Sequence, residues 1–263
     1  MSWQKFLLIP RLAWHGVRAP SDAAKAWERY WGGIQRTGAD GDVLWDAGSE
    51  AELSQSLQRV LSHMDRTLPI LDVGCGNGRH TRALAPHFPA AHGLDLSSRA
   101  IEKAREESRD VSNISYRVLD ASQPGVGRQL AEELGEVNAY VRGVFHILDP
   151  EHRLGMVRNL RELLGRRGVL FLLETAHEGS PLDYLQSLGA TATSIPAPLR
   201  RCIASGVRPP EAFDERMFRK YFPEGEWETL ACGKTVIHGV PMSSRDQLEQ
   251  IPGFFALVRS RMS

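Results

Sequence analysis

The chain has 263 residues, of which 32 are lysine or arginine and 32 are aspartate or glutamate. This balance provides no overall field to attract nucleic acid or an anionic membrane. Three widely separated cysteines exclude a disulfide framework and a paired-cysteine zinc site, and fit a reducing cytosol. No apolar run approaches about 18 residues, so we expect no membrane-spanning helix. The length favours one undivided domain of the size of many enzymes, which we expect to be cytoplasmic, without a metal, and a monomer or homodimer.

The first twenty residues are basic and aromatic. Lys5, Arg11 and Arg18 lie among apolar side chains, and no acidic residue precedes Asp22. The apolar run is too short for a signal peptide and is interrupted by Pro10. Two interpretations stay open: a flap that packs over the domain, which we favour, and a basic amphipathic segment at a membrane surface.

A second helix, which we expect Ser21 to cap, carries an aromatic stripe. Trp27, Tyr30, Trp31 and Ile34 follow the i, i+3, i+4, i+7 spacing of one helix face. Such a stripe is usually core, but this one precedes the sheet and belongs to no βα unit. We therefore weigh core against the roof of an active site. We expect residues 1–48 to form a helical lid in which the three aromatic residues face a substrate.

Residues 70–81 form the most informative motif of the chain. After an apolar run and Asp72, glycines occupy alternate positions at Gly74, Gly76 and Gly78. This order predicts a buried strand, a tight turn and a helix N-terminus. Because glycine has no Cβ, a ligand can approach the turn closely. The G-x-G-x-G spacing differs from the G-x-G-x-x-G of dinucleotide sites, which counts against a nicotinamide cofactor.

Acidic residues also end the next two predicted strands. Asp95 follows the second strand about twenty residues later, and Asp120 follows the third, with Ala121 behind it. Either aspartate alone would more often be a helix N-cap. Because both aspartates fall at the carboxyl ends of successive parallel strands, together they instead predict a ligand site. A carboxylate at Asp95 can accept paired hydrogen bonds from ribose hydroxyls.

These ordered motifs resemble the class I S-adenosylmethionine-dependent methyltransferases over roughly residues 50–175. The resemblance implies an α/β fold: a Rossmann-like, seven-stranded, mostly parallel sheet with helices on both faces and an antiparallel last strand pair. Residues 49–263 would form the S-adenosyl-L-methionine-binding domain. The cofactor-binding residues it implies are Asp72, Gly74, Cys75, Gly76, Gly78, Asp95, Leu96, Asp120, Ala121 and Arg142.

The rest of the chain completes this pattern. Helices are expected after the strands, near 79–87, 98–107, 127–134 and 150–164. Residues 175–225, with Ser-Pro, Pro-Ala-Pro and Arg-Pro-Pro segments, depart from the βα alternation. An excursion of this length usually carries function, so we expect a substrate-covering insertion. Strands near 227–239 and 253–261 would close the sheet, with a bulge at Gly233.

Methyl transfer from a sulfonium is an in-line displacement, for which placement of the reactants supplies much of the rate. A general base is needed only for a poorly acidic hydroxyl or a protonated amine. The candidate catalytic residues after the fourth strand are Tyr140, Arg142 and His146. His146 could serve as the base, with a structural hydrogen bond as the alternative. Glu174 and His177 are less favoured for catalysis, and we expect His177 to face the substrate.

The segment Tyr140-Val-Arg142-Gly143 is also similar to the thiopurine S-methyltransferase branch, which implies that Arg142 lies near a thiol acceptor. The match covers about fifteen residues, and Asn138 stands where many methyltransferases have an acidic residue. We therefore expect methylation of an O, N or S atom of a small molecule in an enclosed pocket. The alternatives are a protein of this fold that guides a non-methylating reaction such as a cyclisation, and a protein-modifying methyltransferase.

Overall fold

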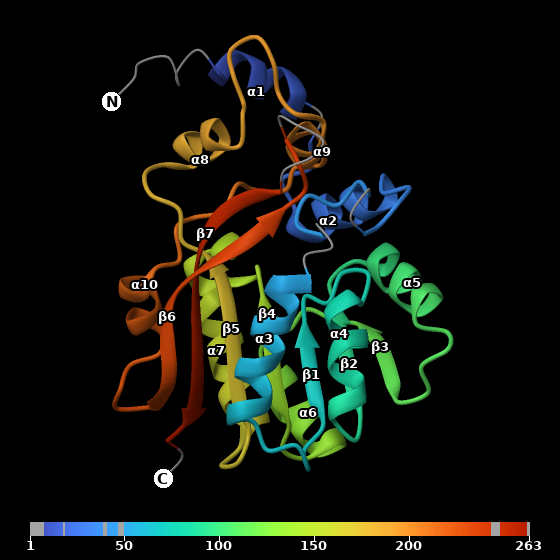
Figure 1. Cartoon of the computed structure of the whole chain (residues 1–263), viewed down its shortest axis with the longest axis vertical. Helices are drawn as coiled ribbons and strands as arrows, with labels where there is room; N and C mark the ends of the chain where they lie inside the picture. The colour runs from blue at the N-terminus through green and yellow to red at the C-terminus, as the bar shows by residue number, and fades with distance from the viewer. Residues whose placement is uncertain (1–7, 18, 39–40, 47–49, 243–247, 262–263) are drawn as a thin grey trace.

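A seven-stranded sheet forms the centre of the protein (Figure 1). The computed structural model describes residues 8–17, 19–38, 41–46, 50–242 and 248–261. The strand order is β3-β2-β1-β4-β5-β7-β6; β7 pairs antiparallel with both β5 and β6, and all other pairs are parallel. This confirms the predicted Rossmann-like sheet. The strands are β1 (Ile70–Val73), β2 (Ala91–Asp95), β3 (Ile114–Val118), β4 (Asn138–Arg142), β5 (Val169–Thr175), β6 (Trp227–Gly239) and β7 (Glu249–Ser260).

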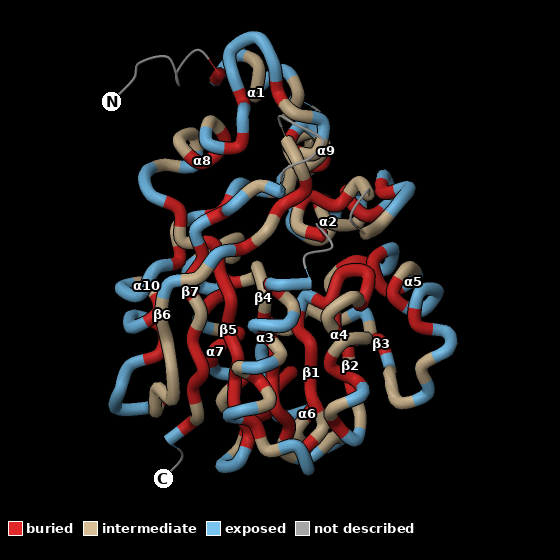
Figure 2. Tube along the Cα trace, in the orientation of Figure 1, coloured by how far each residue is buried: buried red, intermediate tan, exposed pale blue. Residues whose placement is uncertain are grey.

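Helices cover both faces of the sheet, so its central strands are buried (Figure 2). All seven residues of β5 are buried, as expected for a strand enclosed on two sides. Helices α6, α7 and α10 contribute to the cluster on one face, and α3 and α4 to the other. The helices are α1 (Ile9–Gly16), α2 (Ala23–Gly32), α3 (Glu50–His63), α4 (Arg79–Leu84), α5 (Ser98–Glu107), α6 (Val126–Leu134), α7 (Pro150–Leu164), α8 (Pro181–Ser187), α9 (Ala197–Ser205) and α10 (Glu215–Tyr221).

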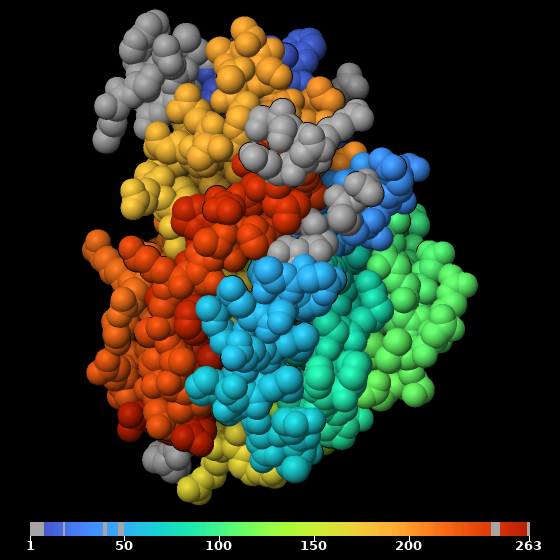
Figure 3. Space-filling view, in the orientation of Figure 1, coloured from blue at the N-terminus to red at the C-terminus, as the bar shows by residue number. Residues whose placement is uncertain are grey.

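The N-terminal helices and part of the insertion gather at the carboxyl end of the parallel strands. Helix α2 packs against α5 and α9, and α1 packs against α9. The space-filling view shows α2, in blue, beside the green surface of α5 (Figure 3). Asp22, and not Ser21, caps α2, because it directly precedes the first helical residue and accepts a hydrogen bond from Lys25 N at 2.8 Å. Lys5 and Arg18 lie outside the described residues.

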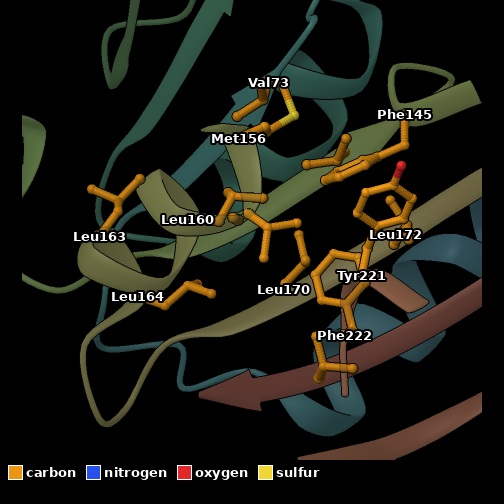
Figure 4. Close-up of a cluster of buried hydrophobic side chains, with 14 of the residues drawn as sticks. Val73, Phe145, Met156, Leu160, Leu163, Leu164, Leu170, Leu172, Tyr221 and Phe222 are labelled. Carbon is orange, nitrogen blue, oxygen red and sulfur yellow. The ribbon is translucent and has the colours of Figure 1, made fainter. Parts of the chain in front are cut away.

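The core has two apolar layers, one on each face of the sheet. Along β5, Leu170 and Leu172 belong to the layer of α7, whereas Val169, Phe171 and Leu173 belong to the opposite layer. Strand residues alternate between faces in this way. Figure 4 shows leucines of α7 packed against Leu170 and Leu172. Each buried leucine of this kind contributes about 1.5–3 kcal/mol relative to an exposed one.

The last strand pair is irregular at a different place from the one predicted. The register of β6 against β7 shifts between Thr229 and Ala231, whereas Gly233 pairs regularly with Phe255. The predicted bulge at Gly233 is therefore wrong. A Cβ at Gly233 would lie 3.3 Å from Cε1 of Phe255, so this glycine makes room for an aromatic ring. Within the described residues, no helix is long and apolar enough to cross a membrane.

Candidate active site

The glycine turn after β1 adopts a conformation that favours glycine. Gly74, Gly76 and Gly78 have φ values of 75°, 55° and 74°. The turn is fastened to β2, because Gly74 N and Cys75 N both donate to the carbonyl oxygen of Leu94, at 2.8 and 2.9 Å. A Cβ at Gly76 would lie 2.8 Å from Cζ2 of Trp31. The main chain of the turn is thus accessible to a ligand beneath an indole ring.

Asp95 is held in place by main-chain hydrogen bonds. Gly76 N donates to Oδ2 and Ser97 N donates to Oδ1, each at 2.9 Å. Burial raises the pKa of Asp95 to about 6, even though these N–H groups favour the ionised form. The carboxylate is therefore oriented between the glycine turn and α5, with lone pairs left for a ligand's hydroxyl groups.

Asp72 lies at the end of β1 and is almost completely buried. The Thr81 hydroxyl donates to its Oδ2 at 2.6 Å. Burial raises the pKa of Asp72 to about 7 against this hydrogen bond, and the charge of Asp95 adds to the rise. Two acidic groups of raised pKa consequently lie at the carboxyl ends of adjacent strands, as expected at a functional site.

These residues line a first cavity of about 1010 Å³, a volume that includes open space at its mouth. Its floor comes from the carboxyl ends of β1 to β4, and Trp27, Trp31 and Trp45 form its roof. Gly78 is the one predicted cofactor residue that does not line it; it caps α4 and packs against the Tyr116 hydroxyl. The predicted cofactor residues that line the cavity are Asp72, Gly74, Cys75, Gly76, Asp95, Leu96, Asp120, Ala121 and Arg142.

A second cavity of about 830 Å³, again including open space, adjoins the first. Its walls come from α2, α8, α9, the 207–210 segment and the strands β6 and β7, and they are mainly apolar. The two cavities have a common wall, to which Trp27, Trp45, Arg142, Gly143 and Ile147 belong. Ligands in the two cavities would therefore meet at this common wall.

Arg142 lies in the common wall and forms a buried ion pair with Glu52. Its Nε donates to Glu52 Oε1 at 2.7 Å, and the two side chains are 9% and 7% exposed. Burial alone would lower the pKa of Arg142, but Glu52 raises it above its usual value. Glu52 Oε2 also accepts a hydrogen bond from His238 N at 2.6 Å. The predicted substrate-side arginine thus has a charge partner from α3.

His146 lines the second cavity and is held by the fully buried Glu174. His146 Nδ1 lies 2.6 Å from Glu174 Oε2. Glu174 also accepts hydrogen bonds from the main-chain N–H groups of Val144, Phe145 and His146 at 3.0–3.1 Å. Thr175 N lies 3.3 Å from the same Nδ1, but the shorter contact with a carboxylate favours a proton on Nδ1. Nε2 is then the proton acceptor of the ring.

The structure places the other three predicted site residues in different surroundings. Tyr140 lines the first cavity, and its hydroxyl lies 3.0 Å from His80 Nδ1. Burial raises the pKa of Tyr140 far above its usual value, so the hydroxyl is neutral. Tyr30 lines neither cavity and stacks against Trp45, with ring centroids 5.2 Å apart. His177 also lines neither cavity; it is buried against Tyr184, and burial lowers its pKa.

The sequence analysis missed Trp45 and Asp46, which lie between α2 and α3. Asp46 is buried and accepts hydrogen bonds from Gly38 N at 2.9 Å, Asn77 Nδ2 at 3.1 Å and Arg79 at 3.0 Å. It thereby joins the N-terminal segment to the glycine turn. No pattern in the sequence marks these two residues, and the partners that join Asp46 to the glycine turn and α4 are about 30 residues away.

Residues 70–168 match the model of a family described as a methyltransferase domain. The chain belongs to the class I S-adenosylmethionine-dependent methyltransferases, as its ordered motifs predicted. It is similar to thiocyanate methyltransferase 1 of Brassica oleracea, with 30% identity over 179 residues, which cover 62% of this chain and 76% of that protein.

Solved structures agree with this assignment. The chain is similar to a SAM-dependent methyltransferase from Anabaena variabilis, with 32% identity and a TM-score of 0.81 over 92% of this chain and 97% of the other. An N-methyltransferase from Bradyrhizobium japonicum in complex with S-adenosyl-L-homocysteine shares the fold, with 20% identity and a TM-score of 0.52 over 80% and 86% of the two chains. The cofactor is S-adenosylmethionine.

The residues of the first cavity fit this cofactor. The glycine turn borders the cavity with main-chain atoms at Gly74 and Gly76, and a Cβ at Gly74 would clash with Val144 Cγ2 at 2.5 Å. Asp95 offers a carboxylate whose oxygens are already oriented by main-chain donors. Leu96 and Ala121 add apolar surface on the same side. A ligand with a ribose and a flat aromatic base matches this combination.

Proposed function

We propose that this enzyme transfers the methyl group of S-adenosylmethionine to an O, N or S atom of a small molecule bound in the second cavity. The common wall at Arg142, Gly143 and Ile147 carries this proposal, because it brings the contents of the two cavities together. The walls of the second cavity are mainly apolar. They therefore suit an organic acceptor better than a small anion such as thiocyanate, after which the Brassica relative is named.

The first cavity binds and orients the cofactor. Asp95 would accept hydrogen bonds from the ribose hydroxyls, and Leu96, Asp120 and Ala121 would border the adenine. The glycine turn and Asp72 would hold the methionine part. When bound, S-adenosylmethionine supplies a methyl group on a positively charged sulfur, which leaves as a neutral thioether. The tryptophan roof excludes water and limits the positions that the two reactants can adopt.

His146 accepts the proton of the acceptor atom. Its Nε2 takes the proton from a hydroxyl or thiol as the new bond to carbon forms, or from an ammonium group before its nitrogen attacks. Glu174, whose Oε2 lies 2.6 Å from Nδ1, favours this tautomer and stabilises the imidazolium that results. Arg142 adds a fixed positive charge to the common wall. An enclosed apolar cavity also favours a small molecule over a protein substrate, which would need an open groove.

The test measures methylated product and S-adenosylhomocysteine by mass spectrometry over a set of small hydroxyl, thiol and amine acceptors. His146→Gln should lower kcat about 10²- to 10⁴-fold and leave cofactor affinity unchanged, because His146 does not line the first cavity. His63→Gln, at an exposed histidine of α3, is the matched control. A wild-type kcat in His146→Gln would mean that His146 does not act as the general base. Conversion of an acceptor without methyl transfer would instead support a non-methylating reaction.

A further inference from the structure

The second cavity is built for an apolar body. Leu185, Leu199 and Ile203 line it from α8 and α9, and Ile237 and Ile251 line it from the last two strands. Trp27 and Trp45 close one side. A ligand that fills this space exchanges water for hydrocarbon over most of its surface, and this exchange is the main favourable contribution to binding in such a site.

The charged groups at the inner end of the cavity already have partners. Arg142 is paired with Glu52, and His146 is paired with Glu174. The Cys202 thiol is neutral, because burial raises its pKa to about 12. The inner wall consequently has no uncompensated charge that would require a charged ligand group at that end.

Arg208, at the mouth of the cavity, differs from these groups. It lines the cavity and is exposed, and within the described residues it has no hydrogen bond or ion pair. The charge of Arg208 acts on the carboxylate of Asp149. The pKa of Asp149 is lowered mainly by hydrogen bonds from His152, and Arg208 makes a smaller contribution. Asp149 is thus already engaged by His152, at 3.1 Å from its N–H and 2.7 Å from its Nδ1.

The main chain around Arg208 is fixed at both ends. Val207 N donates to the carbonyl oxygen of Cys202 at 3.1 Å, and Glu211 N donates to that of His146 at 2.8 Å. Pro209 and Pro210 restrict the backbone between them. The Arg208 side chain therefore extends from a fixed backbone position at the mouth of the cavity. The same segment is hydrogen-bonded to the main chain of His146, the residue proposed as the base.

We propose that the acceptor is an amphipathic carboxylate, with an apolar body in the second cavity and its carboxylate on Arg208. This inference rests on the proposed function and names the class of its acceptor. A planar guanidinium matches a carboxylate through two parallel hydrogen bonds. The end of the acceptor that carries the nucleophile then points inward, toward the common wall. A cationic acceptor is disfavoured, because Arg208 repels it and the apolar wall offers it no partner.

Calorimetry in the presence of S-adenosylhomocysteine tests this proposal without requiring the true acceptor. The probes are 4-phenylbutyrate and indole-3-propionate, each compared with its primary amide. Each acid should bind about threefold to tenfold more tightly than its amide, and added salt should reduce this preference. Arg208→Gln should abolish the preference and leave the amides unchanged. Arg200→Gln, at an exposed arginine of α9 that lines neither cavity, should keep it.

Equal binding of acids and amides would overturn the proposal, as would a preference that survives in Arg208→Gln or the failure of every acid to bind. S-adenosylhomocysteine binding and methyl transfer by the wild-type protein are measured separately. If the wild-type protein lacks either one but still prefers acids to amides, the proposed function is rejected and the carboxylate site is retained.

Discussion

The floor and the roof of the first cavity are constructed in different ways. The floor consists of the glycine turn and Asp95, whose positions depend on main-chain hydrogen bonds between adjacent parallel strands. The roof consists of Trp27, Trp31 and Trp45, which come from a segment outside the sheet. A motif of about ten residues specifies the floor. The roof depends on side-chain pairs between distant parts of the chain.

Two carboxylates attach the roof at opposite sides of the cavity. Glu28 of α2 accepts hydrogen bonds from the hydroxyls of Ser97 and Ser98 at 2.7 and 2.6 Å, at the beginning of α5. Burial would raise the pKa of Glu28, but the bonds from Ser98 and Ser97 lower it overall, so Glu28 is ionised. Asp46 joins the other side to Arg79 at 3.0 Å. We propose that residues 22–38 and 41–46 form a lid that must open for cofactor exchange.

The largest effect on cofactor binding is expected from a substitution in the floor whose side chain would clash with the roof. Gly76→Val should abolish cofactor binding, because its Cβ would lie 2.8 Å from Trp31 and the residue has positive φ. Calorimetry with S-adenosylmethionine measures the loss. Gly135→Val is the control, since Gly135 also has positive φ but no heavy atom within 4 Å of its Cβ position. Equal damage in both variants would assign the loss to backbone strain alone.

A smaller effect is expected from the charge on the floor. Asp95→Ala should weaken cofactor binding by about 1.5–3 kcal/mol, the value of a hydrogen bond to a charged group. The pKa of Asp95 near 6 also makes wild-type binding depend on pH. Ribose hydroxyls donate to the ionised form, so affinity should rise about tenfold between pH 5 and 7.5. Asp95→Asn should flatten this profile; an unchanged profile would assign the titration to Asp72.

The stability of the ligand-free protein should change with pH in the opposite direction. Asp95 and Asp72 have folded-state pKa values of about 6 and 7, above their ordinary value. Their contribution is fully present at low pH, where both states of the protein bind the protons. It is lost as pH rises through the folded values, because the unfolded chain ionises more readily. Thermal melting with and without S-adenosylhomocysteine, at pH 5 and 7.5, separates the two trends.

The contrast between the floor and the roof of the first cavity also explains how much of the structure could be predicted from the sequence. Apolar runs and the spacing of Asp72, Asp95 and Asp120 are local signals, so the strands were predicted correctly, and the cofactor-binding role of the floor stays a prediction. The cap at Asp22 and the bulge near Thr229 were misplaced, because neighbouring residues could serve equally well locally. The ion pair of Arg142 with Glu52 joins residues 90 positions apart, and no periodicity indicates it. Long-range polar pairs of this kind position the roof and the second cavity.

The smallest effect is expected from loosening one attachment of the roof. Glu28→Gln keeps the size of the side chain but removes the charge that accepts from Ser97, Ser98 and Arg99 N. Because Glu28 is half-exposed, the loss should be less than about 1 kcal/mol, or about a twofold to fivefold faster release of S-adenosylhomocysteine. Stopped-flow tryptophan fluorescence measures this rate, since three tryptophans line the first cavity.

Glu102→Gln is the matched control for this variant. Glu102 lies on α5 and pairs with the same Arg99 at 3.1 Å. Its loss alters the helix surface and leaves the contact between α2 and α5 intact. Release should therefore stay at the wild-type rate in this variant and accelerate only in Glu28→Gln. Equal rates in all three proteins, with normal melting temperatures, would mean that opening of the roof does not limit release. The roof would then be a static part of the cavity wall, as its aromatic packing alone would allow.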